Sequence, residues 1–291
     1  MNAAGIGAGL TVAAALARAR AAGLDRIDRE LLLAELLQRD RTWLLIHDDH
    51  LLGDALARRW DDWCARRAAG VPVAYLTGRH GFHGLDLHVT PAVLDPRPDT
   101  ETLVDWALDL LGERPADAPA PAVLDLGTGS GAIALALKHR HGTARVTAVD
   151  RSAAALAVAR GNGERLGLTV DWRCGSWFTP LDDPAGGARY DLIVSNPPYI
   201  RHDDPHLAAL RHEPLEALVS GPDGLDDLRT LVDGAPAHLA DGGWLLLEHG
   251  HDQADAVAAM FAAAGWQDIA HRQDLGGHRR CTGARWRHGR A

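Results

Sequence analysis

The strongest chemical signal in the chain is an acceptor corner at residues 196–199, which reads Asn-Pro-Pro-Tyr. It follows the apolar run 190–194, which predicts a buried strand. Proline fixes φ and has no N–H to donate to a sheet, so the strand must end here and Asn196 lies at a rigid corner. The Asn196 side chain and the Pro197 carbonyl are hydrogen-bond acceptors, and Tyr199 adds an aromatic wall. Acceptors beside a flat apolar surface suit a planar NH2 group, such as an amide or an amino base, although most Asn-Pro pairs are polar turns.

A glycine-rich stretch at residues 127–131, Gly-Thr-Gly-Ser-Gly, is the second signal. It follows a predicted strand and opens a predicted helix, and its glycines allow the backbone to turn sharply and to approach a ligand closely. Asp150 ends the next predicted strand, where a carboxylate can accept hydrogen bonds from both hydroxyls of a ribose. The pattern suits two cofactors, S-adenosylmethionine (SAM) and NAD, because Gly127-x-Gly129-x-x-Ala132 also fits the relaxed dinucleotide fingerprint.

Two features favour SAM over NAD. Asp125 lies just before the glycines, where an acid would face the ammonium or the sulfonium group of SAM. The acceptor corner ends the fourth predicted strand, where a methyl acceptor would lie, and nicotinamide chemistry has no use for such a corner. The two motifs together predict transfer of a methyl group to a planar NH2 group.

The chain resembles the peptide chain release factor N5-glutamine methyltransferases over nearly its whole length. The resemblance is carried by motifs in the family's order: Arg97-Pro98-Asp99-Thr100-Glu101, residues 125–137, Asp150, Trp177-Phe178, the acceptor corner and Leu246-Leu247-Glu248-His249-Gly250. It implies the class I methyltransferase fold, a Rossmann-like α/β fold whose seven-stranded, mostly parallel sheet has an antiparallel last strand, preceded by a small helical N-terminal domain. It also implies an enzyme of translation termination that uses SAM to methylate the glutamine of the Gly-Gly-Gln motif in release factors.

The resemblance further implies roles for individual residues. The cofactor contacts would come from Gly127, Thr128, Gly129, Ser130, Gly131, Asp150, Trp177 and Asn196. The substrate glutamine would be held by Asn196, Pro197, Pro198 and Tyr199, with Asn196 and the Pro197 carbonyl as the catalytic groups. Many members have an acid just before the Trp-Phe pair, whereas this chain has Ser176, so adenine recognition here would depend more on Trp177.

The amide substrate decides what the protein must contribute. An amide nitrogen is a poor nucleophile because its lone pair is delocalised into the carbonyl, and no ordinary side chain could deprotonate it first. Positioning by two acceptors and electrostatic preorganisation are therefore expected, without a general base, and the proton can leave after methyl transfer. Glu101 and Glu248 could act from behind the site or could be structural, and the sequence leaves both readings open.

These motifs lie on a predicted two-part scaffold. The predicted domains are a helical N-terminal substrate-recognition domain at 1–80, a hairpin and linker at 81–98, and the methyltransferase domain at 99–291. Three helices are expected in the first domain, the first two capped by Thr11 and Asp28 and the third opening at Asp54. The tryptophans at 60 and 63 are expected in its core, and Gly81 and Gly84 are expected to turn the hairpin before a strand at 85–89.

Beyond residue 99, helices and strands alternate. The predicted strands are 122–126, 144–149, 169–173, 190–195, 244–248, 266–270 and 281–287, and the predicted helices include 131–140, 152–166, 225–239 and 254–264. This alternation predicts a parallel sheet covered on both faces, with ligands at the C-terminal ends of the strands.

Composition limits the partners. The 291 residues carry a formal charge of −9, and residues 1–90 hold no basic stripe, so a nucleic-acid surface is not expected. Apolar runs fall short of the roughly 20 residues that span a bilayer, and residues 1–10 lack the charged start of a signal peptide, so a cytoplasmic protein without membrane contacts is predicted. The 16 histidines form no recognised ligand pattern, and no metal is predicted.

Three other functions remain open from the residues alone. The same tetrapeptide binds the amines of adenine N6 or guanine N2 in nucleic-acid methyltransferases, which must also hold a flipped base. A ribosomal-protein glutamine is a second protein substrate, against which the Arg97–Glu101 motif weighs. A non-catalytic SAM-binding module is a different class, against which the intact acceptor corner weighs.

Overall fold

The computed structural model describes residues 9–115, 117–181 and 189–288. The chain divides into two compact units, Met1–Arg79 and His80–Ala291. Most of the N-terminal stretch used for the signal-peptide prediction lies outside the described residues. In the described part of the chain, no helix is long and apolar enough to cross a membrane.

The first unit is built from short helices around an aromatic core. Its helices are α1 (Val12–Ala21), α2 (Arg26–Leu37), α3 (Arg41–Ile46), α4 (Asp54–Ala68) and α5 (Val73–Thr77). Trp60 and Trp63 of α4 are buried as predicted, and the Trp60 indole donates a hydrogen bond to the Ala15 carbonyl at 3.2 Å. This bond satisfies the polar edge of a fully buried ring, as a buried indole requires.

The predicted caps are correct at one helix end and wrong at another. Thr11 accepts the N–H of Ala14 and caps α1. The cap of α2 is Asp25, whose carboxylate accepts the N–H of Asp28 at 2.8 Å, whereas Asp28 was expected in that role. Asp28 instead forms an ion pair with Arg67 of α4, which joins two helices. The short helices α3 and α5 were not predicted, because six and five residues hold too little periodicity to be recognised.

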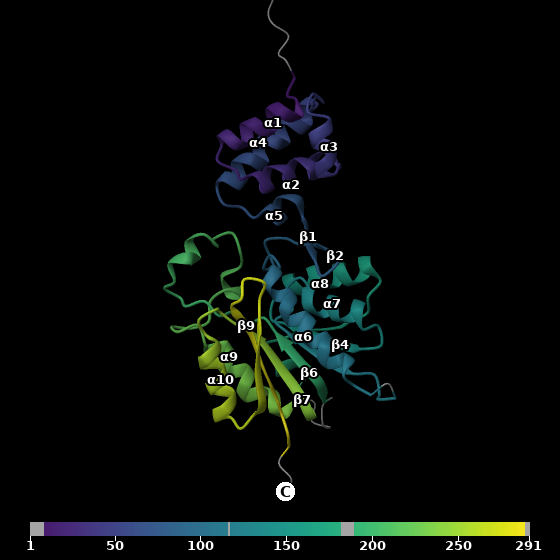
Figure 1. The fold of residues 1–291 in the computed structure, drawn as a ribbon, viewed down its shortest axis with the longest axis vertical. Helices are drawn as coiled ribbons and strands as arrows, with labels where there is room; N and C mark the ends of the chain where they lie inside the picture. Colours follow the sequence, from purple (N-terminus) through teal and green to yellow (C-terminus); the bar gives the residue numbers. More distant parts are fainter. Residues whose placement is uncertain (1–8, 116, 182–188, 289–291) are drawn as a thin grey trace, which may run out of the picture. The chain divides into compact units, whose positions relative to one another are not determined.

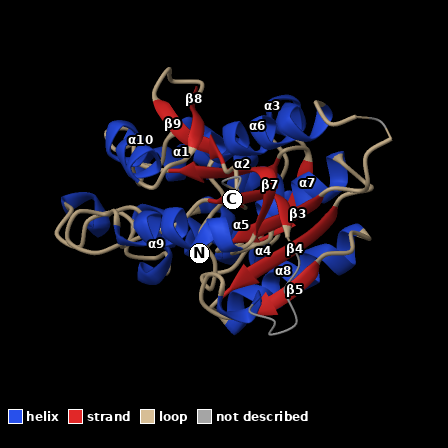
Figure 2. Ribbon diagram, turned by 90° about the horizontal axis from the view of Figure 1, so that it is seen from below, coloured by secondary structure: helices blue, strands red, loops and turns tan. Residues whose placement is uncertain are grey.

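The second unit contains the predicted class I methyltransferase sheet. Within the described residues the sheet has seven strands in the order β5-β4-β3-β6-β7-β9-β8. The strands are β3 (Ala122–Leu126), β4 (Arg145–Asp150), β5 (Asp171–Cys174), β6 (Tyr190–Ser195), β7 (Leu239–Glu248), β8 (Gln267–Gln273) and β9 (Arg279–Arg285). The last strand, β9, is antiparallel to both neighbours and the other pairings are parallel, which confirms the predicted fold (Figure 1, Figure 2).

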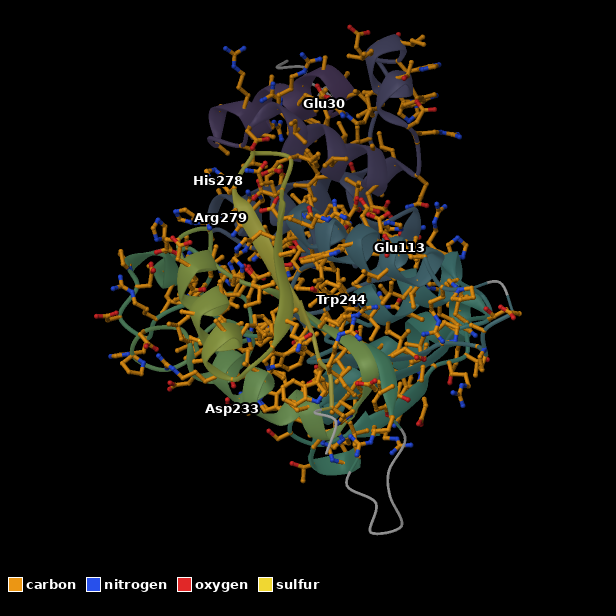
Figure 3. The ribbon with its side chains drawn as sticks, turned by 60° about the horizontal axis from the view of Figure 1, so that its bottom comes forward. Glu30, Glu113, Asp233, Trp244, His278 and Arg279 are labelled. Carbon is orange, nitrogen blue, oxygen red and sulfur yellow. The ribbon has the colours of Figure 1, made fainter. Side chains whose placement is uncertain are left out.

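Helices cover both faces of this sheet (Figure 1). One face packs against α6 (Glu101–Gly112) and α7 (Ala132–Arg140), with α8 (Ala153–Leu166) beside α7, and the other packs against α9 (Asp226–Gly234) and α10 (Ala254–Ala263). Along β3, Val123 faces the first layer and Leu124 the second, as the two-residue period of a strand requires. On the first face, Trp244 of β7, labelled in Figure 3, meets Trp106 of α6 edge to face, with 6.3 Å between the ring centroids. The hairpin of β8 and β9 turns just before His278 and Arg279, which are also labelled there.

Two local predictions need correction. The helix predicted at 225–239 ends at Gly234, and a 3-10 turn at Ala235–Ala237 follows, because Pro236 has no N–H for an α-helical bond. The hairpin of β1 (Arg79–Phe82) and β2 (Leu85–His88) is turned by His83 and Gly84, with φ of 48° and 80°, whereas Gly81 lies inside β1. Positive φ at both central residues is the turn geometry that matches the twist of a hairpin.

Asn162 of α8 ties this hairpin to the glycine-rich stretch. The Asn162 side chain is fully buried, and its Oδ1 accepts the N–H of His88 at 2.7 Å. Its Nδ2 donates to the carbonyls of His88 at 2.9 Å and Ser130 at 3.0 Å. One amide therefore pairs three backbone groups that would otherwise lack these partners, and it fixes the start of α7 relative to β2.

We expect Asn162→Ala to lower the free energy of unfolding by about 1–3 kcal/mol, because it removes three hydrogen bonds to the backbone, of which the one to the Ser130 carbonyl is buried. Chemical denaturation of the full chain measures this change. Gln273→Ala, which removes an exposed amide, is the control and should have little effect. Equal stability of the Asn162 variant and the wild type would contradict the assignment.

Candidate active site

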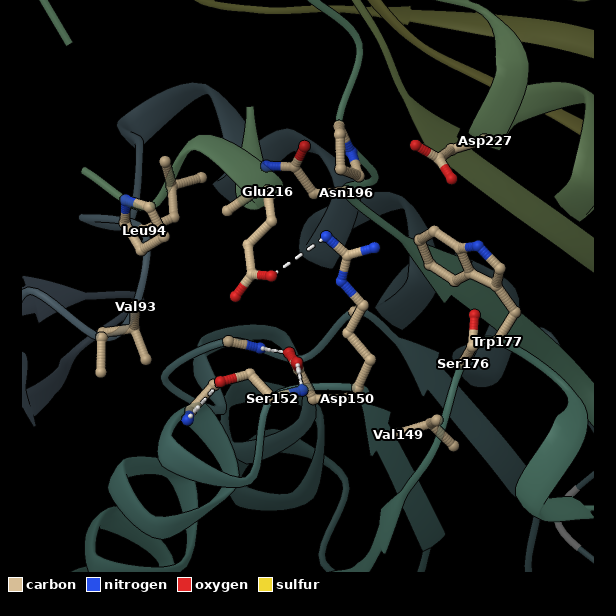
Figure 4. Close-up of a pocket in the computed structure, with 18 of the residues that line it drawn as sticks. Val93, Leu94, Val149, Asp150, Ser152, Ser176, Trp177, Asn196, Glu216 and Asp227 are labelled. Carbon is tan, nitrogen blue, oxygen red and sulfur yellow. Dashed lines mark hydrogen bonds and ion pairs between the residues drawn. The ribbon is translucent and has the colours of Figure 1, made fainter. Parts of the chain in front are cut away.

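A pocket opens at the C-terminal edge of the sheet, where the predicted motifs meet. It is lined by the ends of four strands and the loops that follow them: Gly127 and Gly129 after β3, Asp150 and Arg151 after β4, Ser176 and Trp177 after β5, and Asn196 and Pro198 after β6 (Figure 4). β4 and β6 flank β3 on opposite sides, so the chain leaves β3 at the point where the strand order reverses. Parallel α/β sheets bind ligands at such a switch point.

The glycine-rich stretch turns beneath the pocket as the sequence predicts. Gly127 and Gly129 have φ of 73° and 56°, values that other residues adopt only with strain. A Cβ at Gly127 would lie 3.4 Å from the Trp177 ring, an ordinary van der Waals contact, so the positive φ and not lack of space favours glycine here. The Gly129 N–H donates to Asp150 at 2.8 Å, which joins the turn to the end of β4.

Three residues predicted as cofactor contacts do not line this pocket. Thr128 is buried, and its hydroxyl donates to Asp125 Oδ2 at 2.6 Å. Ser130 is buried, and its carbonyl accepts from Asn162. Gly131 has φ of 83°, and a Cβ there would lie 3.0–3.2 Å from three side chains. In this structure these residues shape the turn.

Asp125 does not line the pocket either, although the sequence suggested that it faces the cofactor. Its side chain is fully buried, and Oδ2 accepts the Thr128 hydroxyl and the Ala134 N–H, at 2.6 and 3.2 Å. Burial raises the pKa of this carboxyl to about 7, and the two hydrogen bonds oppose the rise. Asp125 thus fastens the turn to the first residues of α7, where N–H groups favour a negative charge.

Asp150 presents a carboxylate to the pocket. Its Oδ1 accepts the Ser152 N–H and its Oδ2 accepts the Gly129 N–H, both at 2.8 Å. Burial raises the pKa of Asp150, and these backbone hydrogen bonds lower it. Each oxygen has one partner and can accept a second, so two neighbouring hydroxyls are suitable ligands.

Trp177 adopts a left-handed backbone, with φ of 48°, which is uncommon for a large side chain. Its indole lines the pocket and also packs against the apolar core of the second sheet face. Such backbone strain persists where the surroundings fix it, and it occurs often at ligand sites. Ser176 is exposed on the same rim, so the position that departs from the family pattern does face the pocket.

The acceptor corner is held from behind. The Asn196 amide donates from Nδ2 to Thr100 Oγ1 at 3.1 Å, and within the described part of the chain no hydrogen bond to its Oδ1 is seen. Pro198 lines the pocket and Pro197 is buried. The Tyr199 hydroxyl donates to Glu248 Oε1 at 3.3 Å. The corner therefore offers the Asn196 carbonyl oxygen as a free acceptor.

The segment after the acceptor corner folds back over the pocket, which sequence reasoning missed. Pro214, Glu216, Ala217 and Val219 line the pocket, and the Ile200 N–H and carbonyl bond to Leu218 and Ser220 at 2.8 and 2.9 Å. Glu216 forms an ion pair with Arg151 across the pocket at 3.2 Å (Figure 4). The available signal was the long polar interval between β6 and α9, too long for an ordinary connection.

Buried Glu213 ties the same segment to the predicted Arg97–Glu101 motif. It pairs with Arg97 at 2.6 Å and accepts the Asp95 N–H at 3.3 Å. Glu101 accepts the His83 N–H at 2.7 Å, so the structure gives it a structural contact at the hairpin turn.

The pocket residues fit SAM better than a metal. The Asp150 carboxylate suits ribose hydroxyls, the Trp177 ring suits a flat base, and Gly127 and Gly129 bring no side chain into the space. No group of three His, Cys, Asp or Glu side chains among the described residues is arranged to hold a metal ion.

Comparison with known proteins matches both units. A family model described as "PrmC N-terminal domain" matches residues 10–78, and "Methyltransferase small domain" matches residues 100–217. The solved structure of a methyltransferase from Pyrococcus furiosus aligns with a TM-score of 0.52 at 19% identity, over 77% of this chain and 98% of that one. A T. thermophilus 16S rRNA N2 G1207 methyltransferase aligns with a TM-score of 0.52 at 21% identity, over 72% and 50% of the two chains. At these identities the likeness shows the fold alone.

Curated relatives are more similar. The release factor glutamine methyltransferase of Pseudomonas aeruginosa is 48% identical over 90% of this chain and 92% of the relative. That of Xylella fastidiosa (strain Temecula1) is 49% identical over 92% and 96%. With nearly half of the residues shared across both units, the chain belongs to the family of release factor glutamine methyltransferases, which confirms the resemblance seen in the sequence.

Proposed function

We propose that this chain transfers a methyl group from S-adenosylmethionine to the side-chain amide nitrogen (N5) of the glutamine in the Gly-Gly-Gln motif of peptide chain release factors. The observation that carries this proposal is the Asn196 amide, whose Nδ2 is occupied by Thr100 while its Oδ1 stays available beside the pocket. An oriented acceptor suits the N–H of a substrate amide. Family membership supports the choice of release factors, since the relatives that share 46–49% of residues carry that substrate in their names.

The proposed work of the acceptor corner is orientation. The Asn196 Oδ1 accepts one substrate amide hydrogen and the Pro197 carbonyl accepts the other, which fixes the nitrogen and raises its electron density. Tyr199 and Pro198 form the walls between which the planar amide lies. SAM supplies an activated methyl group when bound. These residues lower the barrier by holding the acceptor nitrogen in line with the methyl group, through proximity and preorganised dipoles.

Cofactor binding is proposed to rest on the residues that line the pocket. Asp150 accepts the ribose hydroxyls, Trp177 contacts the adenine ring, and Gly127 and Gly129 allow close approach of the cofactor. Thr128, Ser130 and Gly131 contribute through the shape of the turn. Ser176 can hydrogen-bond to the adenine but brings no charge.

The helical unit is proposed to recognise the body of the release factor, consistent with the predicted domains 1–80, 81–98 and 99–291. A Gly-Gly-Gln loop offers few side-chain contacts besides the glutamine, so binding energy must come from remote surface. The unit exposes apolar side chains suited to such a contact, among them Ile27, Leu45 and Ile46, at 59, 66 and 69%. Because release factors act on ribosomes, we also propose that the protein works in the cytoplasm.

Two rival substrates are separated by one experiment. A ribosomal-protein glutamine or a nucleic-acid amine could use the same acceptor corner, since an rRNA methyltransferase shares the fold. Mass spectrometry after incubation with labelled SAM should find the label on the Gly-Gly-Gln glutamine. A release factor with that glutamine changed to glutamate is the matched control and should stay unlabelled. Preferred labelling of ribosomal protein, DNA or RNA would overturn the proposal.

Asp150→Ala should weaken SAM binding about 10- to 100-fold, because it removes charged hydrogen bonds to the ribose. Calorimetry on the folded variant measures the affinity. Asp171→Ala, which removes an exposed carboxylate at the start of β5, is the control. Unchanged SAM affinity in Asp150→Ala would remove the ribose assignment.

Asn196→Ala should leave the melting temperature near the wild-type value and reduce turnover at least about 100-fold, by analogy with the loss of one preorganised polar group. Initial rates with saturating SAM and release factor measure the effect. Near-normal turnover in this variant is incompatible with the proposed acceptor corner.

Changing Leu45 and Ile46 together to Ser should raise KM for a whole release factor about 10-fold or more, because each is a large exposed apolar contact. The same variant should treat a Gly-Gly-Gln peptide like the wild type. Ala55→Ser, on the exposed side of α4, is the control. Equal proportional effects on both substrates would argue against recognition by this surface.

A further inference from the structure

A buried carboxylate lies directly behind the acceptor corner, and neither the sequence motifs nor the pocket assigns it a role. Glu248 is the last residue of β7 and is 1% exposed. Its Oε1 accepts the Tyr199 hydroxyl at 3.3 Å, and the Thr100 hydroxyl lies close enough to lower the pKa of this carboxyl. Its Oε2 is buried and has no hydrogen-bond partner in the described part of the chain. A carboxylate is rarely buried so completely without being paired, so an unpaired oxygen here needs a reason.

Thr100 connects this carboxylate to the acceptor corner. Its side chain is 4% exposed, and its Oγ1 accepts the Asn196 Nδ2–H at 3.1 Å. A hydroxyl has one hydrogen to donate, and because the Thr100 oxygen already accepts from Asn196, that hydrogen can go to the neighbouring Glu248 carboxylate. The corresponding order of donors is Asn196 to Thr100 to Glu248, with Tyr199 as a second donor to the same carboxylate.

We propose that Glu248 is a positioning residue that sets the direction of this hydrogen-bond chain and so keeps the Asn196 Oδ1, and not its Nδ2, toward the substrate amide. The reason is that an ionised carboxylate can only accept hydrogen bonds. It compels Thr100 to donate to it, which leaves the Thr100 oxygen to accept from Asn196. This inference rests on the proposed role of Asn196.

A hydrogen bond in the opposite direction, from Thr100 to Asn196, would disable the acceptor corner. If Thr100 donated its hydrogen to Asn196 Oδ1, the Asn196 amide would rotate and present its NH2 group to the substrate NH2 group. Two donors facing each other hold neither group, and the cost of an unpaired polar group in a closed site would oppose binding of the amide. The two orientations of an asparagine have nearly the same shape, so sterics alone do not choose between them.

The charges around Glu248 allow the ionised form at working pH. Arg280 of β9 lies nearby and is itself paired with Asp99 at 3.3 Å and Asp274 at 3.1 Å. Burial raises the pKa of Glu248 to about 7, the Thr100 bond, Arg280 and Tyr199 lower it, and Asp99 raises it. Burial also raises the pKa values of its neighbours Tyr199 and Cys281, which keeps both protonated. The carboxylate is thus lost as pH falls through about 7.

Glu248→Gln tests the proposal with almost no change of shape. An amide keeps one acceptor oxygen and replaces the other with an NH2 donor, so a hydroxyl that donated to the second carboxylate oxygen must turn away and accept instead. The turnover number should fall about 10- to 100-fold, while SAM affinity measured by calorimetry should stay within about twofold, because Glu248 does not line the SAM pocket. Thr100→Val should cause a similar loss, and the double variant should be no worse than Thr100→Val alone, since both act through one chain.

The pH profile separates positioning from packing. Wild-type turnover should decline as pH falls through about 7, and Glu248→Gln should lack the part of that decline that belongs to Glu248. Asp125 and Asp150 also have raised pKa values but are present in both proteins, so the difference between the profiles reports Glu248. Glu101→Gln, whose amide oxygen can still accept the His83 N–H, is the matched control and should keep the wild-type rate and profile.

The outcomes distinguish the two proposals. Wild-type turnover with an unchanged pH profile in Glu248→Gln would overturn the positioning role. A loss of rate with an unchanged profile would overturn it too, because it would indicate packing alone. If Asn196→Ala is inactive while Glu248→Gln is normal, the acceptor corner stands and only this inference fails. If Asn196→Ala keeps its turnover, the proposed function of the corner fails first.

Discussion

The parallel pairing of β3 with β6 sets the geometry on which the rest of the site depends. Leu126 pairs with Ser195 at the C-terminal ends of these strands, and the Ser195 hydroxyl donates to the Leu126 carbonyl at 2.7 Å. The next residues along the two strands are Gly127 and Asn196. The glycine turn and the acceptor corner, which are far apart in the chain, are therefore held side by side by one register, which a shift of one residue would destroy.

Three buried or half-buried carboxylates surround this junction, and each does different work. Asp125 fastens the glycine turn to α7, Asp150 faces the pocket, and Glu248 lies behind the acceptor corner. Burial raises the pKa of all three carboxyls, and in each case hydrogen bonds from other groups of the chain oppose the rise. Carboxylates with raised pKa values gathered at one strand edge are a mark of a functional site more than of a structural one.

The walls of the pocket come from segments distant in sequence. The segment after the acceptor corner covers the pocket, and buried Glu213 joins it to Arg97 ahead of α6. Thr100, three residues after Arg97, holds Asn196. None of residues 97–101 is among those that line the pocket in the described part of the chain. This motif instead braces the loops that line it, which explains how a short polar segment can matter to a site that it does not line.

The sequence by itself determined the fold class, the glycine turn, Asp150, the acceptor corner and the family, because each is written in a contiguous pattern of apolar runs, glycines and prolines. It misplaced the cap of α2 and expected Asp125 at the pocket, because both depend on which groups each carboxylate reaches in the packed chain. It missed two short helices because six and five residues hold too little periodicity. Only the tertiary structure decided that Thr100 and Glu248 stand behind Asn196, since these residues are 96 and 52 positions away along the chain. It also decided that Oδ1 is the free atom of Asn196. Hydrogen-bond direction is a property of a network of partners, and those partners exist only once the sheet has brought its strands together.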